Sequence, residues 1–184
     1  MPSLDSKTTA LVLIDLQNGI VGMDLAPRSG GEVAETGKAL AATFRAAGAP
    51  VILVHVSFAG GLAPPQNVDA PMPSATPPAD WSDLVEGVRQ AGDVVVLKHH
   101  WGAFTGTDLD LVLRRRGVKT IVLGGIATNF GVESTARSAW EHGYDVVLAE
   151  DACTSASAEA HGFAVKTIFP RISRVVQVAD VTLG

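Results

Sequence analysis

Residues 120–137 read TIVLGGIATNFGVESTAR, and this stretch is the most informative part of the chain. An apolar run ends in two glycines and small polar residues, and it passes directly into a helical pattern. Such a junction directs backbone N–H groups toward a ligand. The sequence therefore predicts a ligand site where this strand meets its helix.

The rest of the chain repeats the same strand-then-helix pattern. Short runs rich in Val, Ile and Leu recur at 10–14, 51–56, 94–97, 120–123, 145–149 and 174–178. These runs are continuously apolar, which is typical of strands buried on both faces. Helical patterns separate most of them, at 32–47, 107–116, 132–142 and 157–168. The alternation predicts a three-layer α/β/α domain around a mainly parallel sheet, and the 184 residues suit one domain over 1–184.

The composition of the chain limits the kinds of partner and the compartment that we expect. Charged residues make up 18% and hydrophobic residues 47%, so we expect some apolar surface to be covered in a homo-oligomer, a dimer or a tetramer. A net charge of −5 disfavours binding to nucleic acid, whose phosphate backbone is also negatively charged. The apolar runs are too short to cross a membrane, which needs about 20 residues. A single cysteine and no recognisable targeting segment favour the cytoplasm.

Two further apolar runs end in a charged residue. Asp15 follows the run 10–14 and Lys98 follows the run 94–97, so both side chains belong at the carboxyl ends of strands, where open parallel sheets bind ligands. Each residue also has a simpler interpretation, because an aspartate caps turns and a lysine at a strand end reaches into water. Burial would raise the pKa of Asp15 and a nearby lysine would lower it.

Other reactive residue types form no recognisable site. His99 and His100 are adjacent on an extended segment and point to opposite faces, so they cannot easily bind one ion. Cys153 has no base placed by sequence to activate it, and a free cysteine is usually a buried packing residue. The glycine turn lacks the spacing of a nucleotide-binding loop. The sequence therefore predicts neither a metal nor a cofactor.

The segment 59–80 interrupts the alternation with six prolines among small residues. It leaves the end of the second predicted strand and would therefore lie beside the proposed site. We interpret it as a substrate lid, with a disordered linker as the alternative.

Three segments together resemble the isochorismatase-like hydrolase superfamily, also called the cysteine hydrolases. They are LVLIDLQ at 11–17, KHHWGAF at 98–104 and GIATNFGVESTAR at 125–137, followed by Glu150-Asp151-Ala152. The resemblance covers essentially the whole chain and implies a six-stranded sheet of order 3-2-1-4-5-6. It implies that Asp15 and Lys98 are catalytic.

The resemblance also assigns roles to the glycine turn. Most members use a cysteine at the start of the helix, and the matching residue here is Gly131. The implied cis peptide bond is Ile126-Ala127, and the implied oxyanion donors are the N–H groups of Ala127 and Gly131. Glycine offers no nucleophile, and the metal-binding Asp-x-His of nicotinamidases is replaced by 57–59, Ser-Phe-Ala.

Isochorismatases proper also carry glycine at this position and act on a vinyl ether. The resemblance thus implies a hydrolase for a small metabolite in which Asp15 protonates the enol carbon, Lys98 holds the acid, and water attacks. An amide hydrolase that uses bound water and an inactive metabolite-binding homologue are the alternatives.

Residues around the predicted site are candidates for binding the substrate. The aromatic residues form apolar walls if they face the pocket, and are otherwise core or interface residues. Arg28 is the one evident basic group nearby. The glycine turn adds two polar residues. The predicted contacts are Trp101, Phe104, Phe130, Thr128 and Asn129.

Overall fold

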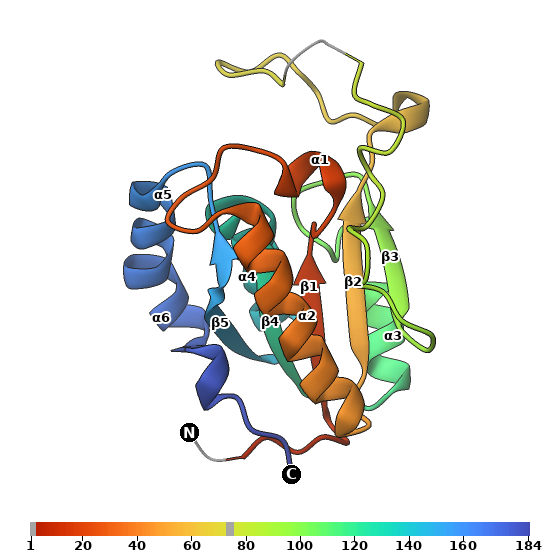
Figure 1. The fold of residues 1–184 in the computed structure, drawn as a ribbon, viewed down its shortest axis with the longest axis vertical. Helices are drawn as coiled ribbons and strands as arrows, with labels where there is room; N and C mark the ends of the chain where they lie inside the picture. Colours follow the sequence, from red (N-terminus) through yellow and green to blue (C-terminus); the bar gives the residue numbers. More distant parts are fainter. Residues whose placement is uncertain (1–2, 73–75) are drawn as a thin grey trace.

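The computed structural model describes residues 3–72 and 76–184, and its centre is a six-stranded sheet of order β3-β2-β1-β4-β5-β6 (Figure 1). All five neighbouring pairs of strands are parallel. The strands are β1 (Thr9–Ile14), β2 (Val51–Val56), β3 (Val94–Lys98), β4 (Thr120–Ile126), β5 (Asp145–Thr154) and β6 (Arg174–Val176). The expected fold class and strand order are confirmed.

Helices cover both faces of this sheet. The α-helices are α1 (Asn18–Val21), α2 (Gly30–Ala46), α3 (Leu109–Arg115), α4 (Glu133–Glu141), α5 (Ala158–Phe163) and α6 (Phe169–Ile172). Short helical turns complete the list: η1 (Ala59–Gly61), η2 (Thr128–Val132), η3 (Ala164–Ile168) and η4 (Val178–Asp180). None of the helices in the described part of the chain is long and apolar enough to cross a membrane.

Two apolar layers hold the helices to the sheet. On one face Val33, Leu40 and Phe44 of α2 pack on the sheet, and on the other Leu113 of α3 and Phe169 of α6 do so. All six residues of β1 are buried, because this central strand has helices on both sides. The continuously apolar sequence of the strands follows from this double burial.

The structure corrects two predicted boundaries. β5 continues to Thr154, because a bulge between its pairings with Leu123 and Gly125 lets the strand resume after an irregular stretch. Cys153 therefore lies within β5 and not after it. The helix predicted at 157–168 is divided into α5, a π-helical turn and α6.

The proline-rich segment lies beyond the carboxyl ends of the strands, away from the chain termini (Figure 1). Apart from η1, its described residues form no helix or strand, and nearly all are exposed. Residues 73–75 of the predicted lid lie outside the described residues. Its role as a lid stays a prediction.

Candidate active site

Asp15 is the first residue after β1, and its backbone turns sharply there. Its φ of 55° lies in the left-handed region, the one such value among the described residues other than glycine. Aspartate tolerates this conformation better than most residues. The residue itself is only 5% exposed, so the turn keeps the carboxylate beneath the surface.

Lys98 ends β3 and reaches this carboxylate from two strands away. Its Nζ donates to Asp15 Oδ2 at 2.8 Å and to the carbonyl oxygen of His100 at 3.0 Å, and the residue is 2% exposed. The interpretation of Lys98 as a solvent-exposed strand end is therefore wrong. The structure brings together the two residues that the sequence selected.

The electrostatics of this pair favour a carboxyl group that can hold a proton. Burial raises the pKa of Asp15 to about 6, although the charge and hydrogen bond of Lys98 act in the opposite direction. Asp15 Oδ1 is buried and has no hydrogen-bond partner among the described residues. A buried acceptor without a donor is costly, and a substrate or water supplying one would remove that cost.

The glycine turn lies directly beside this carboxylate. A Cβ atom at Gly131 would lie 3.3 Å from Asp15 Oδ2 and 3.1 Å from Ile14 Cγ2, so the turn has little room for a side chain. Gly125 is under a stronger constraint, since a Cβ there would lie 2.1 Å from the Ile14 carbonyl oxygen and its φ is +121°. The peptide bond Ile126-Ala127 is cis, as the resemblance implied.

Thr135 anchors the far end of this turn. Its hydroxyl donates to the carbonyl oxygen of Gly131 at 2.7 Å and accepts from the backbone N–H of Ala103 at 3.1 Å. The turn is thereby joined to the segment that follows Lys98. Whether Ala127 and Gly131 act as oxyanion donors stays a prediction.

Two aromatic side chains at the rim of the site are exposed. Trp101 is 58% exposed and Phe130 is 39% exposed, and their ring centroids are 4.8 Å apart. Each belongs to a segment that also contributes a buried site residue, since Trp101 follows Lys98 and Phe130 precedes Gly131. Their position is compatible with the expected apolar wall.

Phe104 lies elsewhere. Its ring stacks on His142 at 5.2 Å and lies 6.0 Å from Tyr144, which immediately precedes β5. This is the amino-terminal edge of the sheet, whereas Asp15 is at the carboxyl-terminal edge. The structure therefore does not bring Phe104 to the carboxylate, because the chain descends along the sheet between β3 and α3.

The two polar residues of the turn are bonded within the protein. Thr128 is fully buried and its hydroxyl contacts the Thr154 carbonyl oxygen and His161, while Asn129 Oδ1 accepts from the Ser155 hydroxyl. The Thr128 side chain is thus unavailable to a substrate in this arrangement.

This site and fold match known proteins. The family model described as "Isochorismatase domain" matches residues 9–180. The chain belongs to the isochorismatase family. It is 50% identical over 184 residues to the isochorismatase family protein YecD of Escherichia coli O157:H7, covering 98% of each chain. It is 34% identical to the ureidoacrylate amidohydrolase RutB of Pantoea ananatis, covering 95% of this chain and 82% of that one.

A solved isochorismatase family protein from Burkholderia thailandensis has the same fold. It superimposes with a TM-score of 0.93 at 49% identity, covering 98% of this chain and 96% of that one. Membership of the isochorismatase family makes this chain a hydrolase by class.

The one cysteine of the chain, Cys153, lies in β5. Cys153 pairs with Gly125 of β4, which in turn pairs with Ile14 of β1, so two strand spacings, about 10 Å, separate Cys153 from β1. Burial raises the pKa of the Cys153 thiol to about 12. A buried, protonated thiol is a poor nucleophile.

The sequence does not predict the partners of Arg28. Arg28, the one evident basic group near the predicted site, forms a two-point ion pair with Glu150, with both N–O distances at 3.0 Å, and it also donates to the Cys153 carbonyl oxygen. Glu150 belongs to the motif Glu150-Asp151-Ala152, but its partners come from distant segments and no local signal reveals them.

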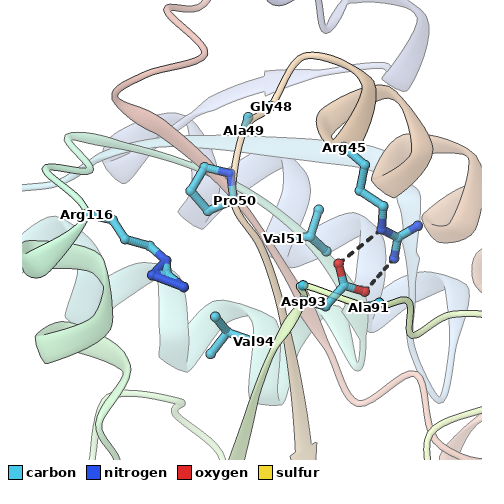
Figure 2. Close-up of a pocket in the computed structure, with 10 residues that line it drawn as sticks. Arg45, Gly48, Ala49, Pro50, Val51, Ala91, Asp93, Val94 and Arg116 are labelled. Carbon is cyan, nitrogen blue, oxygen red and sulfur yellow. Dashed lines mark hydrogen bonds and ion pairs between the residues drawn. The ribbon is translucent and has the colours of Figure 1, made fainter.

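A separate depression of about 290 Å³ lies at the amino-terminal ends of β2 and β3, at the opposite edge of the sheet (Figure 2). Arg45 and Asp93 line it and form a two-point ion pair at 3.0 and 2.7 Å. Within residues 3–72 and 76–184, no group of three or more His, Cys, Asp or Glu side chains is arranged to hold a metal ion.

Proposed function

We propose that this isochorismatase-family hydrolase cleaves a small metabolite of the vinyl-ether type, with Asp15 as general acid and water as nucleophile. The observation that carries the proposal is the buried Asp15–Lys98 pair, with an Nζ–Oδ2 distance of 2.8 Å and an Asp15 pKa of about 6. A general acid works best when its pKa is near the working pH.

In the proposed reaction Asp15 gives its proton to the enol carbon of the substrate. The resulting oxocarbenium ion accepts water at the adjacent carbon, and the hemiketal that forms collapses to a carbonyl compound and an alcohol. The attacking water loses a proton to the Asp15 carboxylate, which restores the acid. Lys98 holds the carboxyl group in position and stabilises the carboxylate that remains after proton transfer.

Gly131 is consistent with this route. By resemblance it occupies the position of the family's nucleophilic cysteine, and glycine offers no nucleophile. The backbone N–H groups of Ala127 and Gly131 are proposed as donors to the substrate oxygen. Trp101 and Phe130 are proposed as the apolar wall.

An amide hydrolase is the second candidate, favoured by the 34% identity to an enzyme described as a ureidoacrylate amidohydrolase. In that case Asp15 would act as the general base, taking a proton from water as the water attacks the carbonyl carbon. The two candidates require opposite protonation states of the same carboxyl group.

The test is an assay of a panel of vinyl ethers and small amides with the wild type and Asp15→Asn. The side-chain amide of asparagine cannot act as a general acid. We therefore expect kcat/KM of Asp15→Asn on the accepted substrate to fall by at least about 10²-fold. Asp93→Asn is the matched control, since it changes another buried, ion-paired carboxylate at the far edge of the sheet. Asp15→Asn activity within tenfold of wild type contradicts the proposal, and ligand binding without turnover would indicate a binding homologue.

A further inference from the structure

A buried chain of polar side chains leads from the surface to the glycine turn. It joins Arg28 before α2, Glu150 in the irregular stretch of β5, His161 in α5 and Thr128 in η2. Thr128 is three residues before Gly131, and none of these four residues contacts Asp15 or Lys98 by a hydrogen bond among the described residues. The chain is therefore distinct from the acid and its lysine.

The hydroxyl of Thr128 has two partners that constrain its single proton. Its Oγ1 lies 2.9 Å from the Thr154 carbonyl oxygen and 2.8 Å from His161 Nδ1. A carbonyl oxygen only accepts, so the hydroxyl proton points to Thr154. The hydroxyl then accepts from Nδ1, and this requires a proton on Nδ1. If the proton pointed to Nδ1 instead, two acceptor oxygens would face each other at 2.9 Å.

The other ring nitrogen of His161 faces an acceptor as well. Nε2 lies 2.7 Å from Glu150 Oε1. Burial tends to raise the pKa of Glu150, but hydrogen bonds from Arg28, Gln177 and His161 outweigh it and lower the pKa to about 2. Glu150 is thus a carboxylate that only accepts, and Nε2 must carry a proton too.

We propose that His161 is a buried imidazolium that positions the glycine turn through Thr128. The Glu150 carboxylate and the Thr128 hydroxyl, which accept from its two N–H groups, hold it in this form, and Arg28 acts only by keeping Glu150 ionised. The charged side chains bonded into the cluster are the Glu150 carboxylate and the Arg28 guanidinium. Glu150 lies in the irregular stretch of β5 between Leu148 and Cys153, and its carboxylate contacts both Arg28 and His161. His161, with 6% of its side chain exposed, is a positioning residue.

The consequence for catalysis rests on the proposed function, whereas the charge state of His161 does not. Thr128 and Thr135 hold η2 from its two ends, so the position of Gly131 over the Asp15 carboxylate depends on both hydroxyl groups. A displacement of about 1 Å at a reacting centre can cost on the order of 10²-fold in rate.

The test begins with the ring nitrogens of the wild-type protein, observed by ¹⁵N NMR at pH 7.5, about one unit above the ordinary histidine pKa. The His161 signals are assigned by their loss in His161→Gln. We expect both ring nitrogens of His161 to carry protons, and the signals of the exposed His100 and His142 in the same spectrum serve as the internal comparison. A His161 ring with one protonated nitrogen at this pH overturns the proposal.

Thr128→Val and Thr128→Ser form a matched pair. Valine keeps the shape of threonine but has no hydroxyl, so Nδ1 loses its acceptor and we expect the ring to become neutral at pH 7.5. Serine keeps the hydroxyl, so we expect the imidazolium to remain. Equal ring states in the two variants overturn the inference that Thr128 fixes the charge of His161.

The kinetic arm uses whichever substrate the assay panel identifies. We expect kcat of Thr128→Val to fall about tenfold to a hundredfold with KM nearly unchanged, and Thr128→Ser to restore it. A Thr128→Val enzyme with wild-type kcat overturns the positioning role. If the panel yields no turnover, the proposed function fails, and the NMR comparison still decides the charge state by itself.

Discussion

At the residue scale, the Asp15–Lys98 pair combines two opposing effects on one carboxyl group. Burial favours the protonated acid, and the ammonium group 2.8 Å away favours the carboxylate. Burial is the larger effect, so the pKa lies near 6, where both forms are populated close to neutral pH. A carboxyl group in this state can give or accept a proton.

The pH profile distinguishes the two candidate reactions by its sign. A general acid works when protonated, so kcat/KM should be highest below about pH 6 and fall about tenfold per unit above it. A general base works when ionised, so an amide hydrolase should instead gain activity as the pH rises through about 6. The measurement is kcat/KM between pH 4.5 and 8, and a profile flat across this range contradicts both roles of Asp15.

Gly131→Ala tests the space over the carboxylate. The new methyl group would lie 3.3 Å from Asp15 Oδ2 and occupy the position where substrate or water must approach, so we expect at least tenfold lower kcat/KM with the fold retained. Gly31→Ala is the control, because no atom lies within 4 Å of a Cβ there. Unchanged activity in Gly131→Ala would show that the reacting atoms lie elsewhere.

At the element scale, the ends of the elements position the functional groups. Helix α2 begins with a reciprocal cap, in which the Ser29 hydroxyl accepts from Glu32 N–H and the Glu32 carboxylate accepts from Ser29 N–H at 2.8 Å. Arg28 is the residue before this cap, so the start of α2 also fixes the origin of the Arg28 side chain. The cap therefore links the stability of α2 to the Glu150 cluster.

Ser29→Ala should lower the free energy of unfolding by about 1 kcal/mol, since it removes the side-chain acceptor of the first helical turn. The measurement is equilibrium unfolding in urea. Ser29→Thr keeps the hydroxyl and should lose much less. If Ser29→Ala is as stable as the wild type, the Ser29 hydroxyl stabilises the helix no more than water does at the same N–H group.

At the scale of the whole molecule, several large apolar side chains are exposed on the surface. Trp101, Trp140 and Phe163 are all more than half exposed. Large exposed apolar side chains are typical of surfaces that associate.

We therefore expect a dimer or a tetramer in solution, with a mass of about two or four times the 19.0 kDa of one chain. Light scattering coupled to size exclusion measures this mass directly. A mass of 19.0 kDa across the micromolar range would contradict the expectation.

The alternation of strands and helices, and the placement of Asp15 and Lys98 at strand ends, follow from the sequence alone, whereas the strand order that brings the two together was implied only by the resemblance. Burial on both faces of a parallel strand requires a continuous apolar run, and a run that ends in Asp15 or Lys98 places that side chain at the carboxyl edge whatever the rest of the chain does. These are local consequences of strand geometry. The cis bond at Ile126-Ala127 came from the resemblance and not from geometry.

The remaining contacts of the site depend on tertiary packing. In the folded chain Phe104 lies at the amino-terminal edge of the sheet, Arg28 pairs with Glu150, and Thr128 is buried against His161. These contacts join residues far apart in the chain, and those of Glu150 and His161 depend on the irregular stretch of β5 and on the packing of α5. The periodicity of the sequence does not predict contacts between remote segments, because these contacts depend on how the elements pack. Strands and their ends, in contrast, depend on the local sequence.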